Sequence, residues 1–212
     1  MHRALHSPAS AARRRDSGEP MTLQRILSPA DYRRTPWKNG AGRTTEIAAH
    51  PAGAALDAFD WRVSFADVAA NGPFSQFARV DRTIVLLAGA GMRLEGAGPA
   101  VLLRTPYEPY AFSGDDAIDC TLVDGPVRDF NLMLRRGRAT GEVAIVRGAA
   151  ARIASARVRL CYAANGASEC LLASRPPLRL AAGHALLVED EPASLAVNPL
   201  TAAAVVVVVR IE

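Results

Sequence analysis

The chain has 212 residues, of which half are apolar and 22% are charged, and its formal net charge is +4. This length and composition suffice for one large domain or two small ones with a sizeable core, and they exclude global disorder. Residues 1–20 hold four arginines against two acidic residues, so only half of the net charge belongs to the rest of the chain. A balance so close to neutral lacks the dense basic face of a nucleic-acid-binding protein.

Cysteine usage and hydropathy indicate the compartment. Cys120, Cys161 and Cys170 are odd in number and lack CxxC spacing, which favours buried thiols in a reducing compartment. The N-terminal stretch AARRRDSGEP is polar where a signal peptide would be apolar. The longest apolar run, Leu200 to Val209, is about half as long as a membrane helix. We therefore expect a cytoplasmic protein without a membrane span, and we interpret this run as a buried strand.

The first forty residues predict little regular structure. Residues 1–20 show no periodicity, and we interpret them as a disordered tail or as the product of an upstream start codon, with Met21 as the true start. The segment LSPADYRRTPW then begins with Ser28 and Pro29, which predict a single helical turn with serine at the N-cap.

From Arg43 onward the pattern predicts strands. Short apolar or alternating runs recur about every ten residues between Gly, Pro, Asn and Asp, as in β-sandwiches and jelly-roll barrels. TIVLLAGAGMRLEG and RVRLCYAANGASECLLAS, one in each half of the chain, both indicate a strand, a glycine turn and a strand. We therefore predict an all-β fold of two fused jelly-roll-like barrels with few short helices. The first barrel would span about 21–125 and the second about 126–212.

The sequence lacks the motifs of several common sites for metals, nucleophilic catalysis and phosphate binding. His2, His6, His50 and His184 are scattered, and neither HxH with a nearby Glu nor HExxH occurs, so we expect no metal and no cofactor. There is no GxSxG motif, and NGAGRTTE lacks the P-loop pattern and its helix. Cys120 lies in an alternating run without a nearby cation, which indicates a packing residue.

Two strand-like stretches carry polar residues on one face. In RTTEIA, alternation places Thr44 and Glu46 together, opposite Thr45 and Ile47. Such a polar face is most often simply exposed to solvent.

The second stretch, DWRVSFADV, has the same pattern. Trp61, Val63 and Phe65 share one face, which leaves Arg62 and Ser64 on the other. If the polar faces point into a barrel, a buried Arg62 must be paired, and Glu46 could pair with it. A free part of the guanidinium would then suit a carboxylate ligand.

Two further stretches are dense in polar residues. NGPFSQFARVDRT would place Ser75, Asp81 and Arg82 near a barrel rim, although such a stretch is more often an ordinary capped loop. GPVRDFNLMLRR places Asp129 and Asn131 on the same face of a strand, where they could hold a polar ligand or each other at a junction between modules.

Three of these segments resemble a known family. PWKNGAGRTTEI, WRVSFADVAANGPFSQFARVDRTIVLLAG and PVRDFNLMLRR are similar, in order, to characteristic segments of the HutD/Ves family, and the resemblance runs from about Leu23 to Arg136. It implies a bicupin, that is, two fused cupin barrels, without the usual metal-binding histidines. The family is linked to bacterial histidine utilisation, where it is proposed to bind an intermediate such as N-formylglutamate and limit flux. Another branch is described only as stress-induced.

The leading hypothesis is a metal-independent regulatory protein that binds a small acidic metabolite, such as N-formylglutamate, urocanate or a formate-like anion. The candidate ligand-binding residues, none of them assigned a catalytic role, are Lys38, Asn39, Thr44, Glu46, Arg62, Ser64, Ser75, Arg82, Asp129 and Asn131.

Other functions stay open. A metal-free hydrolase or isomerase could use Glu46 as general acid or base, although a neighbouring arginine would lower the pKa of that carboxyl and weaken the base. A structural or protein-interaction role is the third alternative. The Val-rich C-terminal strand could also pair across a homodimer if it lay at a sheet edge.

Overall fold

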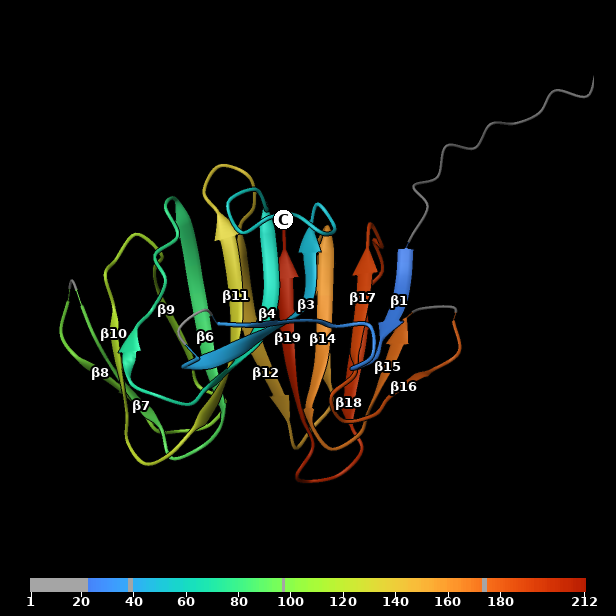
Figure 1. Cartoon of the computed structure of the whole chain (residues 1–212). Helices are drawn as coiled ribbons and strands as arrows, with labels where there is room; N and C mark the ends of the chain where they lie inside the picture. Colours follow the sequence, from blue (N-terminus) through green and yellow to red (C-terminus); the bar gives the residue numbers. More distant parts are fainter. Residues whose placement is uncertain (1–22, 38–39, 97, 173–174) are drawn as a thin grey trace, which may run out of the picture.

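The computed structural model describes residues 23–37, 40–96, 98–172 and 175–212, and this part of the chain is all β, with 19 strands and no helix (Figure 1). None of these residues forms a helix that could cross a membrane. The expectations for residues 1–20 and for Lys38 and Asn39 concern residues outside the described ranges.

The predicted helical turn at Ser28 is replaced by a tight turn between two strands. The backbone N–H and the hydroxyl of Ser28 each donate to Asp31 Oδ2 at 2.7 Å, and the N–H of Asp31 donates back to the Ser28 carbonyl at 2.9 Å. Strand β1 (Leu23–Leu27) ends just before this turn, and β2 (Arg33–Pro36) begins just after it. Serine and aspartate thus close an isolated turn, as they often do.

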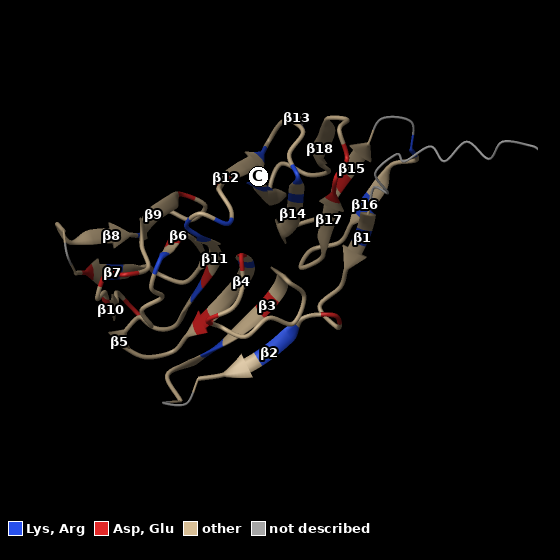
Figure 2. Ribbon diagram, turned by 90° about the horizontal axis from the view of Figure 1, so that it is seen from above, with Lys and Arg blue, Asp and Glu red and all other residues tan. Residues whose placement is uncertain are grey.

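The strands form four antiparallel sheets, which stack as four layers in the view of Figure 2. Outer sheet 1 has the order β5 (Gly72–Pro73), β10 (Asp119–Leu122), β7 (Met92–Glu95), β8 (Val101–Leu103). Inner sheet 1 has the order β2, β3 (Gly42–His50), β4 (Trp61–Val68), β11 (Val127–Arg135), β6 (Val80–Ala88), β9 (Pro109–Ser113).

The other two sheets come from the C-terminal half, apart from β1. Inner sheet 2 has the order β1, β17 (Ala185–Glu189), β14 (Val158–Asn165), β19 (Val205–Ile211), β12 (Gly141–Arg147). Outer sheet 2 has the order β13 (Ala151–Ile153), β18 (Leu195–Pro199), β15 (Ser168–Leu172), β16 (Leu178–Leu180). The C-terminal strand β19 is buried, but it lies inside its sheet, so the edge pairing considered for it cannot form.

Each inner sheet packs against its own outer sheet and also against the other inner sheet. The largest apolar cluster fills the seam between the inner sheets, where Phe65 and Phe130 of inner sheet 1 stack on Tyr162 of inner sheet 2 at centroid distances of 6.0 and 5.9 Å. A second cluster, which includes Cys161 and Cys170, fills the space between inner and outer sheet 2. We call the two sheet pairs sandwich 1 and sandwich 2.

The two sandwiches exchange chain segments at the seam. Strand β11 lies beyond residue 125, near which the first barrel was expected to end, and it pairs with β4 and β6 of inner sheet 1. Strand β1, at the start of the described chain, pairs with β17 of inner sheet 2. The chain passes from sandwich 1 to sandwich 2 between Arg135 and Gly141.

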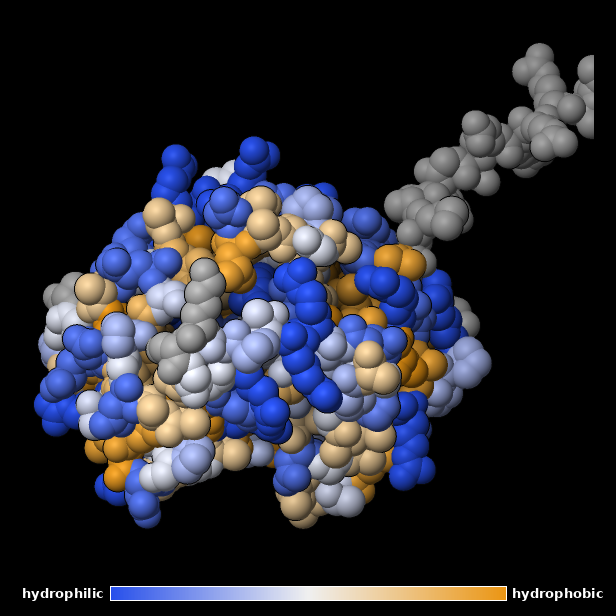
Figure 3. Space-filling model, viewed as in Figure 1, coloured by the Kyte–Doolittle hydropathy of each residue, from blue (hydrophilic) through white to orange (hydrophobic). Residues whose placement is uncertain are grey.

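The outer surface is mixed in polarity. On the face shown in Figure 3, hydrophobic residues form small patches between hydrophilic ones. The large hydrophobic side chains that are exposed come from different elements; they are Leu23, Ile26, Leu56, Leu102, Val123 and Leu200. Single exposed apolar residues of this kind are normal on globular proteins and indicate no binding face by themselves.

The shared seam predicts that the two sandwiches unfold together. Leu160 is fully buried in the seam cluster, so Leu160→Ala should lower the free energy of unfolding by about 2–5 kcal/mol in a single urea transition. Leu102→Ala makes the same change at a side chain that is 53% exposed, and it should cost less than about 0.5 kcal/mol. Two separate transitions, with only one shifted by Leu160→Ala, would contradict a shared core.

Candidate functional site

Strand alternation on β4 and β11 builds the floor of a cavity in sandwich 1. Odd-numbered β4 residues and even-numbered β11 residues face the seam, as the alternation in DWRVSFADV predicted. The intervening residues point to the other face. The antiparallel register pairs them in three rows: Arg62 with Met133, Ser64 with Asn131, and Ala66 with Asp129.

The cavity has a volume of about 730 Å³, which is within the range of small-molecule sites. Its floor consists of the six residues of the three rows, and Thr44 of β3 extends the floor on one side. The walls come from β2, from Trp37 and from the loops that follow β3 and β5. The wall residues are Arg33, Thr35, Pro36, Trp37, Ala55, Leu56, Pro73, Phe74, Ser75 and Phe77.

A buried carboxylate holds two arginines at one end of this floor. Glu46 Oε2 accepts from Arg62 Nε at 2.7 Å and from Arg33 Nη2 at 3.2 Å. Glu46 and Arg62 are each 7% exposed, so their desolvation is offset by this pairing. A bulge in β3 near Glu46 leaves that residue opposite Ser64, and the carboxylate meets Arg62 on the diagonal.

The same end keeps hydrogen-bonding capacity for a ligand. The Nη1 of Arg62 faces the Met133 sulfur at 3.9 Å, which is a weak acceptor. Among the described residues, Arg62 Nη2 and the hydroxyl of Ser64 have no hydrogen-bond partner, and both residues line the cavity. The arrangement presents a charged donor and a hydroxyl to whatever occupies the cavity.

A second buried carboxyl lies at the other end of the floor. Asp129 is 1% exposed, and its Oδ1 accepts from Asn131 Nδ2 at 3.0 Å. Burial raises the pKa of Asp129 to about 6, although the bond from Asn131 and the charge of Arg82 act in the opposite direction. Asp129 is therefore a carboxyl that can change its protonation state near neutral pH.

Arg82 lies behind the wall of the cavity and forms hydrogen bonds that position Asn131 and the backbone of Ser75. Its Nε and Nη2 donate to Asn131 Oδ1 at 3.3 and 3.2 Å, and its Nη1 donates to the Ser75 carbonyl at 3.3 Å. Burial lowers the pKa of Arg82 to about 10, while the charge of Asp129 raises it. Three phenyl rings lie 4.8–5.5 Å from the guanidinium carbon and replace part of its lost hydration; they belong to Phe74, Phe77 and Phe112.

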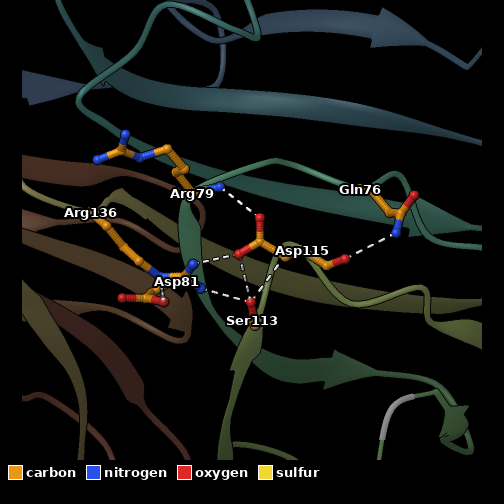
Figure 4. A network of polar contacts seen from close by, with 6 residues as sticks. All are labelled: Gln76, Arg79, Asp81, Ser113, Asp115 and Arg136. Carbon is orange, nitrogen blue, oxygen red and sulfur yellow. Dashed lines mark hydrogen bonds and ion pairs between the residues drawn. The ribbon is translucent and has the colours of Figure 1, made fainter.

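The wall loop that carries Ser75 and Phe77 is fixed from outside by a polar network around Asp115 (Figure 4). Gln76 donates its side-chain amide to the Asp115 carbonyl at 3.0 Å, and the backbone N–H of Arg79 donates to Asp115 Oδ1 at 2.8 Å. Arg136 ties the Asp115 carboxylate to Asp81, to which its Nε donates at 2.7 Å. These contacts anchor one wall of the cavity to β6 and to the end of β11.

The opposite wall rests on a close backbone approach in the motif PWKNGAGRTTEI. Trp37 donates its indole N–H to Thr44 Oγ1 at 2.8 Å and covers Gly42. A Cβ at Gly42 would lie 2.3 Å from the Asp67 carbonyl oxygen and 3.2 Å from the Trp37 ring. Glycine at this position therefore allows the tryptophan to pack against β3 and form a wall of the cavity.

Most of the predicted ligand-binding residues come together. Thr44, Arg62, Ser64, Ser75, Asp129 and Asn131 line the cavity, and Glu46 and Arg82 contact those residues from behind. The sequence interpretation did not include the other lining residues, among them Arg33, Trp37, Leu56, Phe74 and Met133. Met133 could have been predicted, because strand alternation continues from Asp129 and Asn131 to this residue. No local sequence pattern indicates that Leu56 lines the cavity.

Cys120 and the metal-binding residue types were the other candidates for a reactive site. Cys120 packs its sulfur 3.8 Å from that of Met92, and burial raises the pKa of the thiol to about 11, so it is a packing residue at neutral pH. Within the described ranges, no group of three or more His, Cys, Asp and Glu side chains is placed to hold a metal ion.

Comparison with solved structures defines the class of fold. The structure aligns over 88% of the chain with an oxalate decarboxylase from Lactobacillus farciminis, solved as a formate complex, with a TM-score of 0.60 and 6% sequence identity. At this identity only the fold is shared, and it is cupin-type with two sandwiches in one chain.

The chain belongs to the HutD family, whose model matches residues 29–206. A relative from Pseudomonas putida, described as an uncharacterized 21.2 kDa protein in the hutC 3′ region, is 38% identical over 80% of this chain and 88% of its own. Protein Ves from Citrobacter koseri is 40% identical over 54% of this chain and 61% of its own length.

Two solved structures from pseudomonads are similar to this chain. A conserved protein of unknown function from Pseudomonas aeruginosa has a TM-score of 0.83 and 37% identity, over 90% of this chain and 99% of that one. HutD from Pseudomonas fluorescens, solved in a formate condition, has a TM-score of 0.74 and 31% identity, over 90% and 100%. The resemblance to the HutD/Ves family is confirmed.

Gly42→Ala should destabilise the fold because the new Cβ would overlap the Asp67 carbonyl. We expect the free energy of unfolding in urea to fall by about 1–3 kcal/mol. Gly98→Ala is the matched control, since no heavy atom lies within 4 Å of a Cβ there. Equal stability of the two variants would show that Trp37 and Gly42 do not form a packed wall.

The pH dependence of the free energy of unfolding should reveal the raised pKa of Asp129. Because its native pKa is raised, the protonated form stabilises the fold, and this contribution is lost as the pH rises from about 4 through about 6. Asp129→Asn, which can still accept from Asn131, should therefore be more stable than the parent at pH 7.5, by on the order of 2 kcal/mol. The advantage should disappear at pH 4 in thermal unfolding; an advantage that does not depend on pH would contradict the raised pKa.

Proposed function

We propose that this protein binds a small acidic metabolite in the cavity of sandwich 1 and that this binding regulates histidine utilisation. The observation that carries the proposal is the buried Arg62, whose Nε is held by Glu46 while Nη2 is left without a partner among the described residues. A guanidinium oriented in this way is suited to a carboxylate.

The surroundings of Arg62 support a small organic anion rather than a polymer or an inorganic ion. Trp37, Phe74 and Leu56 supply apolar walls, and Ser64 and Asn131 supply hydroxyl and amide groups on the floor. The cavity volume of about 730 Å³ exceeds that of a single carboxylate and leaves room for a body of several heavy atoms. N-formylglutamate, urocanate and formate are the ligands to test first.

The link to histidine utilisation rests on relatives. The family is named HutD, and the Pseudomonas putida relative is described by its position in the hutC 3′ region. We infer the same cellular setting for this chain. A strain that lacks the gene should show altered growth on histidine, restored by the wild-type gene and not by one encoding Arg62→Ala.

Binding should depend on Arg62. Calorimetric titration with the three ligands should give saturable binding of at least one of them, and Arg62→Ala should weaken it about 10- to 100-fold, because a hydrogen bond to a charged group is lost. Arg93→Ala is the matched control, since Arg93 pairs with Glu95 on outer sheet 1 at 55% side-chain exposure. Absence of binding at millimolar concentrations of all three ligands, or equal binding by Arg62→Ala, would overturn the proposal.

An enzyme is the second candidate, and one observation favours it. Asp129, with a pKa near 6 on the floor of the cavity, is placed as a general acid or base, whereas Glu46 is held between two arginines. NMR spectra of the ligands incubated with the protein decide between the two. Turnover that is lost in Asp129→Asn would establish catalysis, and unchanged spectra leave binding as the function.

A further inference from the structure

The charged groups around the cavity leave room for one negative charge on a ligand. Among the described residues that line it or contact its lining, Arg33, Arg62 and Arg82 are cations, and Glu46 and Asp129 are carboxylates. One positive charge is therefore uncompensated when both acids are ionised. Lys38 lies outside the described ranges and is not included in this count.

The two acids differ in what they can do for a ligand. Glu46 is committed to Arg33 and Arg62 through the same oxygen. Asp129 accepts one hydrogen bond, from Asn131 to Oδ1, and Oδ2 has no partner among the described residues although Asp129 lines the cavity. Of the two acids, Asp129 is thus the one that both lines the cavity and keeps a carboxylate oxygen without a partner among the described residues.

The register fixes how a longer ligand meets Asp129. Successive rows of the floor are about 7 Å apart, because side chains on one face of a strand repeat every second residue. A carboxylate held by Arg62 lies in the first row, so a second carboxylate several bonds away reaches the row of Ser64 and Asn131. The next row contains Asp129, whose carboxyl reaches to 3.0 Å from the Asn131 amide, so the second carboxylate would lie beside it, and two adjacent ionised carboxylates in a buried site repel strongly.

We propose that Asp129 sets the charge that the cavity accepts: a monocarboxylate binds directly, whereas a dicarboxylate binds with the uptake of one proton from solvent by Asp129. The proton goes to Oδ2, which then donates a hydrogen bond to the second carboxylate of the ligand. Asp129 and the second carboxylate of the ligand then share one proton. The summed charge of the ligand and of the charged groups counted around the cavity is zero. This proposal rests on the proposed function and names the residue that sets its charge specificity.

The groups that face Asp129 are consistent with this role. Arg82 of β6 favours the ionised form, and Asp67 of β4 opposes it. Cys120 of β10 also faces it and stays a neutral thiol, and Asn131 of the same strand donates to it. Together with burial, these neighbouring groups leave the pKa of Asp129 near 6. The carboxyl is therefore ionised at pH 8, and its protonation there costs only a modest free energy.

The test uses two probes with the same skeleton and different charge, N-formylglutamate and its γ-amide, N-formylglutamine. Calorimetry at pH 8 in buffers of different ionisation enthalpy measures affinity and proton uptake together. We expect the amide to bind at least about tenfold more tightly, with no proton taken up, and the dicarboxylate to bind with close to one proton taken up. At pH 5.5 the difference in affinity should disappear.

Two variants separate Asp129 from general effects of charge. Asp129→Asn should bind the dicarboxylate more tightly than the parent at pH 8 and without proton uptake. Asp119→Asn changes an exposed acid of β10 and should keep the behaviour of the parent.

The outcomes distinguish this proposal from the proposed function. A dicarboxylate that binds at pH 8 without proton uptake, at least as tightly as the amide, would overturn the role of Asp129 and leave the binding function intact. Binding of neither probe, nor of urocanate or formate, would overturn both.

Discussion

Strands β4 and β11 present every second side chain to the seam between the inner sheets and the intervening ones to the cavity. Both of their faces are therefore buried, and nearly every residue of the two strands is inaccessible to solvent. Apolar side chains on one face join the two sandwiches, and polar side chains on the other form the floor of the site. A one-residue slip of either strand would exchange the two faces, so the packing of the seam also fixes the geometry of the site.

The polar floor is stable because its charges are matched within a few ångströms. Glu46 compensates Arg62 and Arg33, while Asn131 links Arg82 to Asp129, and three aromatic rings replace lost hydration around Arg82. Such matching is required when ionic groups leave water. Among the described residues it leaves Arg62 Nη2, the Ser64 hydroxyl and Asp129 Oδ2 without a hydrogen-bond partner, and the proposed binding of an acidic ligand depends on these groups.

Local patterns in the sequence were sufficient for the faces of the central strands and for most of the floor. Alternation in RTTEIA and DWRVSFADV placed Glu46, Arg62 and Ser64 correctly, because each strand has one apolar and one polar face. Long-range pairing was not predictable in this way: nothing near Leu23–Leu27 shows that β1 pairs with β17 of the other sandwich. The turn at Ser28 was predicted as helical because its serine and proline suit both structures, and only the flanking strands decide between them.

The central claim is that a carboxylate is held by Arg62 inside sandwich 1. A crystal structure of the protein with N-formylglutamate, urocanate or formate tests it most directly. The account predicts electron density for the ligand above the floor of β4 and β11, with a carboxylate within hydrogen-bond distance of the Arg62 guanidinium and of the Ser64 hydroxyl. A ligand bound in sandwich 2 or on the outer surface, with the cavity holding only solvent, would contradict it.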